Sequence, residues 1–203
     1  GGLSTVALRM PSHPVASALI DAAGFPLAAP SANVSGRPSP TDAETVWRDL
    51  RGRIEMILDG GPVSVGIEST VIDVSEKLPL LLRPGGMPAE EIEAFLGEPL
   101  RRPDGRSSRR SPGTRYRHYA PTIPVRVWHP EAPFEMAEMA GMELERWGFM
   151  GLAVPPARFG RVLRFESVEN YARGLFSGFR ALEAEGLLGI VAEWPPAAGA
   201  GLG

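Results

Sequence analysis

The sequence contains no cysteine, a single lysine and only three histidines. Without cysteine the chain cannot carry a disulfide framework, a thiol nucleophile or a cysteine-based zinc site. The histidines, His13, His118 and His129, are far apart and form no His-x-x-x-His pair, so we predict no metal site. No apolar run reaches the roughly 18 residues of a membrane span, and the first residues lack a signal-peptide pattern. We therefore expect a cytoplasmic protein.

What is present is typical of a globular protein. Of the 203 residues, 43 % are hydrophobic and 22 % charged, and 24 glycines and 21 prolines indicate many turns. A chain of this length forms one large domain or two small ones. The net charge of −3 gives no overall attraction to nucleic acids or anionic membranes.

Strand-like and helix-like segments alternate in residues 1–97, which predicts an α/β unit. Helices are expected after Ser12 up to Gly24, from a capping box of Thr41 and Glu44 to about Leu50, and from Pro88 through Phe95. Strands are expected at residues 5–9, 26–30, 54–58, 67–74 and 78–83.

Residues 98–122 have the composition of a linker. Between residues 101 and 117 there are seven arginines and one acid, Asp104, with almost no aliphatic side chains. We therefore divide the chain into a first domain at 1–97, an interdomain linker at 98–122 and a second domain at 123–203.

The second domain also alternates strands and helices, which predicts a small, mostly parallel sheet with helices on its faces. Its expected strands are residues 123–128, 149–154, 162–165 and 187–193. Its expected helices are residues 134–147 and 167–185.

The loop SANVSGRPSP, residues 31–40, follows one predicted strand and precedes a helix. Its hydroxyls, its carboxamide and its backbone N–H groups at a helix N-terminus can hold an anion. The same residue types also make an ordinary turn.

Three further segments suggest a ligand site. In GIESTV, polar residues including Ser69 interrupt an apolar strand, so Ser69 faces either a ligand or water. In LLLRPGG, Arg83 ends a strand beside a helix start, where it is either a phosphate ligand or a surface arginine. Thr5 and Arg9 share one face of the first predicted strand, and there the charge of Arg9 needs a partner.

The segment SPGTRYRHYAP, residues 111–121, interleaves arginines with aromatic rings. Such a pattern stacks on a nucleotide base or contacts RNA, and it is equally typical of a solvated linker. The residues that would touch a nucleotide are Tyr116, Arg117 and His118.

Taken in order, TVALRMPSHP, PLAAPSANVSGRPSPT, GIESTVIDV and LLRPGG resemble the YrdC-like domain. SPGTRYRHYAP resembles the interdomain linker of the long form of threonylcarbamoyl-AMP synthase, and residues 169–193 resemble its small Rossmann-like C-terminal domain. The resemblance implies a mixed twisted α/β sheet followed by a small Rossmann-like domain.

The resemblance also implies an activity. The family joins L-threonine, bicarbonate and ATP into L-threonylcarbamoyladenylate and pyrophosphate, and partner proteins use the product to modify certain tRNAs. Magnesium is implied by the triphosphate. The reaction depends on placing substrates and stabilising phosphate charge, so no protein nucleophile and no catalytic residue are predicted.

Carried over residue by residue, the resemblance implies two sets of contacts. Threonine would be bound by Arg9, by the backbone of Ala29 and by Ser69. ATP would be bound by Thr5, Ser31, Ser39 and Arg83, with Asn33 beside Ser31 and with Tyr116, Arg117 or His118 from a linker that covers the pocket.

Two departures from the family pattern concern activity. The family's upstream Pro-Thr-Glu-Thr and Lys-x-Arg segments do not occur here, and Lys77 stands in a different context. We therefore interpret the chain as a fragment of a longer protein and expect it to be weakly active or inactive alone.

Two rival interpretations remain. YrdC-like domains also occur in carbamoyltransferases, but those carry Cys-rich zinc modules and lack the SPG-type linker. A non-enzymatic RNA-binding module is favoured by the Arg-rich stretch and disfavoured by the net charge.

Overall fold

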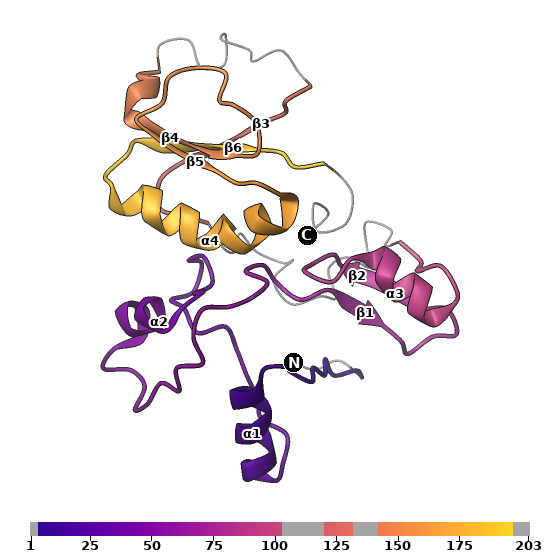
Figure 1. Ribbon diagram of the computed structural model, residues 1–203. Helices are drawn as coiled ribbons and strands as arrows, with labels where there is room; N and C mark the ends of the chain where they lie inside the picture. The colour runs from indigo at the N-terminus through magenta and orange to yellow at the C-terminus, as the bar shows by residue number, and fades with distance from the viewer. Residues whose placement is uncertain (1–3, 103–119, 132–141, 197–203) are drawn as a thin grey trace. The chain divides into compact units, whose positions relative to one another are not determined.

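The computed structural model describes residues 4–102, 120–131 and 142–196 (Figure 1). The chain divides into two compact units. The first, unit 1, comprises residues 1–34 and 39–62, and the second, unit 2, comprises residues 35–38 and 63–203. Helices and strands alternate in a mixed α/β protein, as predicted. No helix in the described parts of the chain combines the length and the apolar character needed to cross a bilayer.

Unit 1 contains two short helices, α1 (Pro14–Ala23) and α2 (Ala43–Leu50). The ring of His13 accepts a hydrogen bond from the Val15 N–H at the start of α1, and Gly24, with φ 70°, ends it. The cap of α2 is Asp42, whose carboxylate accepts the Thr45 N–H at 2.7 Å. The predicted capping box of Thr41 and Glu44 is therefore wrong by one residue, since a carboxylate stands next to the threonine.

The three strands predicted in unit 1, at residues 5–9, 26–30 and 54–58, are not formed. A single bridge joins Ile54 to Arg51. Val6, Leu8 and Met10, which share one face of the first segment, are largely exposed. Alternation of apolar side chains makes a segment compatible with a sheet, but a strand forms only where a neighbour pairs its backbone groups.

In unit 2, β1 (Val71–Asp73) and β2 (Leu80–Arg83) form an antiparallel pair, and α3 (Ala89–Leu96) packs beside it. The strands are shorter than the predicted 67–74 and 78–83. Leu81, Ala89 and Leu100 form the buried core of this part. Arg101 extends the pair, since its N–H donates to the Pro79 carbonyl at 2.9 Å and its carbonyl accepts from Leu81.

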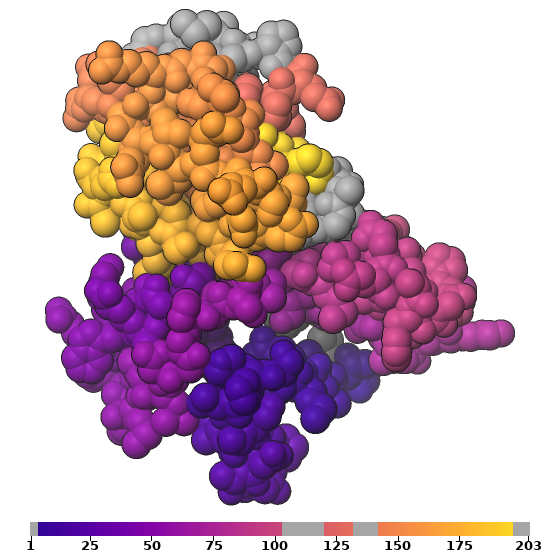
Figure 2. Space-filling view, viewed as in Figure 1, coloured from indigo at the N-terminus to yellow at the C-terminus, as the bar shows by residue number. Residues whose placement is uncertain are grey.

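The remainder of unit 2 contains a parallel four-stranded sheet in the order β3-β6-β4-β5. Its strands are β3 (Val125–Trp128), β4 (Trp147–Gly151), β5 (Arg161–Arg164) and β6 (Gly189–Glu193). Helix α4 (Val168–Ala184) crosses one face (Figure 1). In the space-filling view the residues of β4, β5 and α4 fill one continuous body (Figure 2). The predicted small parallel sheet is confirmed.

The two central strands, β6 and β4, are buried on both faces, as is typical of parallel sheets. Met150 and Ile190 pack against Leu182 of α4 on one face. Phe149 and Val191 pack with Trp147 and Phe159 on the other. Alternate residues of β4 and β6 thus supply two separate cores.

One predicted boundary in this domain is wrong. We expected a helix at 134–147 and a strand at 149–154, but β4 begins at Trp147, and a 3₁₀ turn, η2 (Leu144–Arg146), precedes it. Residues 132–141 lie outside the described residues. Gly148 lies within this strand, and a Cβ at this position would lie 2.8 Å from Leu182 Cδ2. The glycine allows the strand to approach α4 closely, which periodicity does not reveal.

Glu193 and Tyr171 join the ends of β4 and β6. The Tyr171 hydroxyl donates to the carbonyls of Met150, at 3.2 Å, and Glu193, at 2.9 Å. Burial, together with the nearby charge of Glu193, raises the pKa of Tyr171. The Glu193 side chain is buried, and its Oε2 accepts the N–H groups of Leu152 and Ala153, both at 2.7 Å.

Candidate functional site

The predicted site residues fall in both compact units and in the linker. Tyr116, Arg117 and His118 lie outside the described residues. Unit 2 holds Ser69 and Arg83. Unit 1 holds Thr5, Arg9, Ala29, Ser31, Asn33 and Ser39.

Arg83 and Ser69 are in direct contact. The guanidinium donates to the Ser69 carbonyl from Nε at 3.1 Å and from Nη2 at 2.8 Å. Glu68 Oε2 lies 3.7 Å from the same Nη2. Arg83 is mostly buried, with a side-chain exposure of 16 %. Arg83 is therefore not a freely solvated surface arginine, because its head group is fixed at the end of β2 against the GIEST segment.

The two glycines after Arg83 explain the spacing of LLRPGG. A Cβ at Gly85 would lie 2.3 Å from the Glu68 carbonyl oxygen, and the Gly86 N–H donates to that oxygen at 2.8 Å. Thr70 Oγ1 donates to the Met87 carbonyl at 2.6 Å. The turn lies directly on the GIEST segment, and only glycine permits this approach. The LLRPGG and GIEST segments thus form one structural element.

In unit 1 the predicted residues are more exposed. Thr5, Arg9, Ala29 and Ser31 have exposed side chains. The prediction that Thr5 and Arg9 share a strand face is wrong, because residues 5–9 form no strand. The charge of Arg9 faces solvent, so it needs no buried partner in this structure.

Asn33 and Ser39, at either end of the SANVSGRPS loop, are half-buried. The Asn33 carboxamide donates from Nδ2 to the neighbouring Val34 carbonyl at 2.9 Å. Ser39 stands three residues before Asp42, the N-cap of α2. The loop thus leads into a helix N-terminus, as the sequence predicted.

Sequence reasoning missed the residues that hold this loop. Arg37 forms a bidentate ion pair with Glu183 of α4, with N–O distances of 2.6 and 3.0 Å. Arg180 of the same helix donates to the Pro38 carbonyl at 2.5 Å. Arg37 and Glu183 are 146 residues apart, so no spacing within a motif could have indicated the pair.

Two family profiles together match nearly the whole chain. Residues 1–85 match the Sua5, YciO and YrdC family, described as telomere recombination, and residues 87–203 match the family described as threonylcarbamoyl-AMP synthase, C-terminal domain. The chain belongs to the long-form threonylcarbamoyl-AMP synthase family. The family also accounts for the succession of the SANVSG, GIEST and LLRPGG segments before a small parallel sheet.

Curated relatives agree with this membership. The chain is 42 % identical to the threonylcarbamoyl-AMP synthase of Bacillus subtilis, over 99 % of this chain and 61 % of that protein. It is 44 % identical to the enzyme of that name from Pyrococcus abyssi, over 100 % of this chain and 62 % of that protein. The chain thus spans about three fifths of the length of these relatives.

The fold agrees with a solved structure of the family. The crystal structure of P. abyssi Sua5 complexed with L-threonine matches with a TM-score of 0.84 and 40 % identity. The match covers 99 % of this chain and 62 % of that one. This likeness supports the family membership through the fold, independently of the short sequence segments.

The described residues contain no group of three or more His, Cys, Asp or Glu side chains that could hold a metal ion. Magnesium commonly keeps several waters and binds through substrate phosphates with one or two carboxylates.

Proposed function

We propose that the chain is part of a threonylcarbamoyl-AMP synthase, a nucleotidyltransferase that makes L-threonylcarbamoyladenylate and pyrophosphate from L-threonine, bicarbonate and ATP. The observation that carries the proposal is the joint match of residues 1–85 and 87–203 to the two modules of one family. The contact of Arg83 with Ser69 supports it, since both belong to segments that resemble the family's site.

The reaction balances without a protein nucleophile. The amine of threonine combines with bicarbonate to give a carbamate and water. A carbamate oxygen then bonds to the α-phosphorus of ATP, the bond from that phosphorus to the β-phosphate oxygen breaks, and pyrophosphate leaves. Magnesium supplies charge neutralisation at the phosphates when it is bound. The chain's own task is to place substrates and stabilise phosphate charge.

Arg83 is the described residue best suited to the phosphates. A guanidinium offers five N–H donors, so it can contact both the Ser69 carbonyl and an anion. Its head group is already oriented by Ser69, and a preoriented donor loses little conformational freedom when a ligand binds. Thr5, Ser31, Asn33 and Ser39 would complete the ATP contacts. Arg9, Ala29 and Ser69 would bind threonine.

The wider role of the protein follows from the same proposal. The product would pass to proteins that transfer the threonylcarbamoyl group to tRNA, in the cytoplasm. Weak RNA binding by the Arg-rich stretch remains a prediction. A steep loss of RNA affinity as salt is added would support it.

Calorimetric titration of ATP, with magnesium and L-threonine present, tests the proposal on the 203-residue chain, on Arg83→Ala and on Arg164→Ala. Arg164 is a matched control, because it also ends a strand, β5, and donates to a carbonyl, that of Leu152. We expect Arg83→Ala to weaken ATP binding at least about tenfold and Arg164→Ala to leave it unchanged.

Arg83→Lys separates the contribution of the positive charge from that of the guanidinium geometry, because lysine keeps the charge but lacks the planar group with its several N–H donors. We expect it to bind ATP between the wild type and Arg83→Ala. Failure of the wild-type chain to bind ATP would contradict the proposal for this chain, as would equal losses in Arg83→Ala and Arg164→Ala.

A further inference from the structure

Helix α4 and the end of the linker together hold three consecutive residues of the SANVSGRPS loop. The Ala120 N–H, at the end of the linker, donates to the Gly36 carbonyl at 3.1 Å. The Arg37 guanidinium pairs with Glu183, and Arg180 donates to the carbonyl of Pro38, which is fully buried. Residues 35–38 group with α4 in unit 2, whereas residues 1–34 and 39–62 belong to unit 1.

Glu183 is the centre of this arrangement. Its side chain is 12 % exposed and that of Arg37 is 28 % exposed, so their bidentate pair is partly shielded from water. Thr122 also donates to Glu183 Oε1, from both its N–H and its hydroxyl. Burial alone would raise the pKa of Glu183, but hydrogen bonds from Thr122 and Arg37 outweigh it and lower the pKa. One carboxylate thus joins α4, the end of the linker and the loop.

The same face of α4 receives a second segment. Arg173 Nε donates to the Ser64 carbonyl at 2.8 Å. Gly66 has a φ of +84°, and a Cβ there would lie 2.2 Å from the Arg173 carbonyl oxygen. Arg173, Arg180 and Glu183 are spaced by seven and three residues, which places them on one side of a helix. The turn before the GIEST segment and the loop at 36–38 are therefore held by one helix face.

We infer that Glu183 is a positioning residue, which through Arg37 fixes the conformation of the loop that carries Asn33 and Ser39. The inference rests on the proposed function, in which these two residues belong to the ATP site. A loop that is fixed before binding loses less conformational freedom when the nucleotide arrives. In this way the C-terminal domain contributes to ATP affinity without touching ATP.

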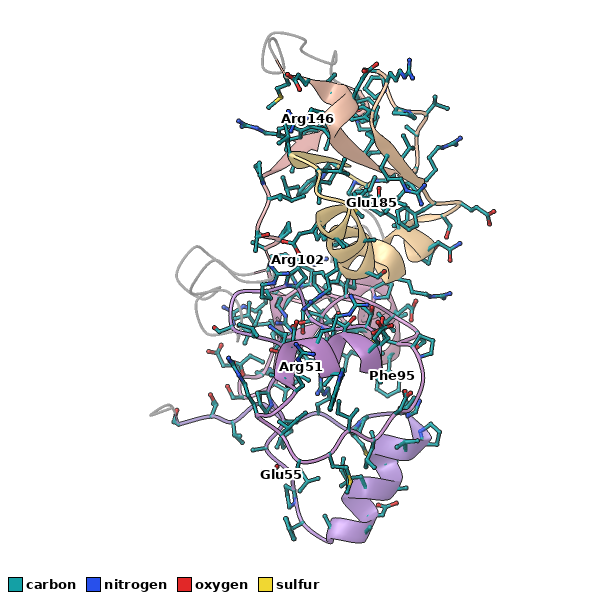
Figure 3. The ribbon with its side chains drawn as sticks, turned by 90° about the vertical axis from the view of Figure 1, so that its left-hand side faces the viewer. Arg51, Glu55, Phe95, Arg102, Arg146 and Glu185 are labelled. Atoms are coloured by element: carbon teal, nitrogen blue, oxygen red, sulfur yellow. The ribbon has the colours of Figure 1, made fainter. Side chains whose placement is uncertain are left out.

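We call the contacts of Glu183 with Arg37 and of Arg180 with Pro38 the clamp. Amide hydrogen exchange without nucleotide tests whether the clamp holds the loop, on the wild-type chain, Glu183→Ala and Glu185→Ala. Glu185, which is labelled in Figure 3, is a matched control, because it caps the same helix and pairs instead with Arg161 at 3.3 Å. We expect Glu183→Ala to speed exchange of the amides of Ser35, Gly36, Arg37 and Ser39 at least about tenfold, and Glu185→Ala to leave it unchanged.

ATP titration of the same variants tests the link to function. We expect Glu183→Ala to weaken ATP binding about tenfold and Glu185→Ala to bind as the wild type does. The doubly exchanged variant, Arg37→Glu with Glu183→Arg, should recover much of the protection and affinity that each single variant loses. Should Glu183→Ala fold poorly, Glu183→Gln replaces it, since the amide keeps the shape and removes the charge.

The outcomes separate the two proposals. Unchanged exchange at 35–39 in Glu183→Ala, or an equal increase in Glu185→Ala, would overturn the clamp. Faster exchange with unchanged ATP affinity would overturn its positioning role. If the wild-type chain binds no ATP, the proposed function fails for this chain, while the exchange comparison still decides whether Glu183 holds the loop.

Discussion

Every residue of β4 and β6 is buried, whereas α1 has no buried residue at all. Both regions contain segments that are rich in apolar side chains. In the C-terminal sheet each strand has neighbours and α4 covers one face. In unit 1 the apolar faces of residues 5–10 and 54–58 pair with no strand in the described parts of the chain. The comparison shows that an amphipathic pattern stabilises a fold only when its partner is present.

The largest expected effect is on the core of the C-terminal sheet. Phe149 is 0 % exposed and contacts the rings of Trp128 and Phe159, whereas Phe95 on α3 is 90 % exposed (Figure 3). We expect Phe149→Ala to lower the free energy of unfolding of this domain by about 3–5 kcal/mol, and Phe95→Ala to change it by less than about 0.5 kcal/mol. Urea denaturation followed by tryptophan fluorescence measures both. Equal effects would show that the two positions do not differ in burial.

A smaller effect is expected at the tyrosine that joins β4 and β6. Tyr171→Phe removes a hydroxyl that donates to two buried carbonyls, so we expect a loss of about 1–2 kcal/mol at pH 7. Because folding raises the Tyr171 pKa above its ordinary value of 10.0, this phenol's contribution to stability is full below about pH 10 and is lost as the pH rises further.

Denaturation at pH 7, 9 and 10.5 follows this dependence. The wild type should lose more stability than Tyr171→Phe between pH 9 and 10.5. Parallel losses in the two proteins would mean that Tyr171 ionises as readily in the folded state as in the unfolded one.

The smallest effect is expected on the surface of unit 1. Arg48 and Glu44 form an i,i+4 ion pair on α2, and both side chains are more than half exposed. Exposed pairs of this kind gain little, because water and salt screen them. Arg48→Gln should therefore leave the thermal midpoint unchanged, as judged by circular dichroism. A clear drop would indicate that unit 1 depends on surface charge rather than on an apolar core.

The predicted bounds of helices and strands were most accurate where residues within the element itself determine its ends. The helix predicted at residues 167–185 was confirmed, since Ser167 caps it and Gly186, with φ +71°, follows its end. The strand predicted at residues 187–193 was also found, but it begins two residues later, at Gly189. They were least accurate where contacts with residues far away in the sequence determine the structure. Residues 5–9 have a strand-like pattern but form no strand, and the predicted helix of residues 134–147 meets a strand that already begins at Trp147.

In the candidate site, too, local patterns were recognised from the sequence, whereas long-range contacts were not. The GIEST and LLRPGG segments were recognised separately, and the fold brings them into contact through Arg83 and Ser69. That both bind a ligand stays a prediction. The pairing of Arg37 with Glu183 could not be predicted, because each residue looks like an ordinary surface charge in its own segment. Such long-range pairs become visible only when the fold brings the residues together.

The position of Glu193 has one more consequence. Sheets of this topology commonly bind a ligand's phosphate at the carboxyl ends of their strands, through backbone amides. Here the amides of Leu152 and Ala153 are bonded to the chain's own carboxylate, and Gly151 leaves it room, since a Cβ there would lie 2.4 Å from Glu193 Oε2. A free anion would compete with a tethered one, whose effective concentration is on the order of millimolar or higher. The Glu193 carboxylate would therefore compete with any phosphate for the N–H groups of Leu152 and Ala153.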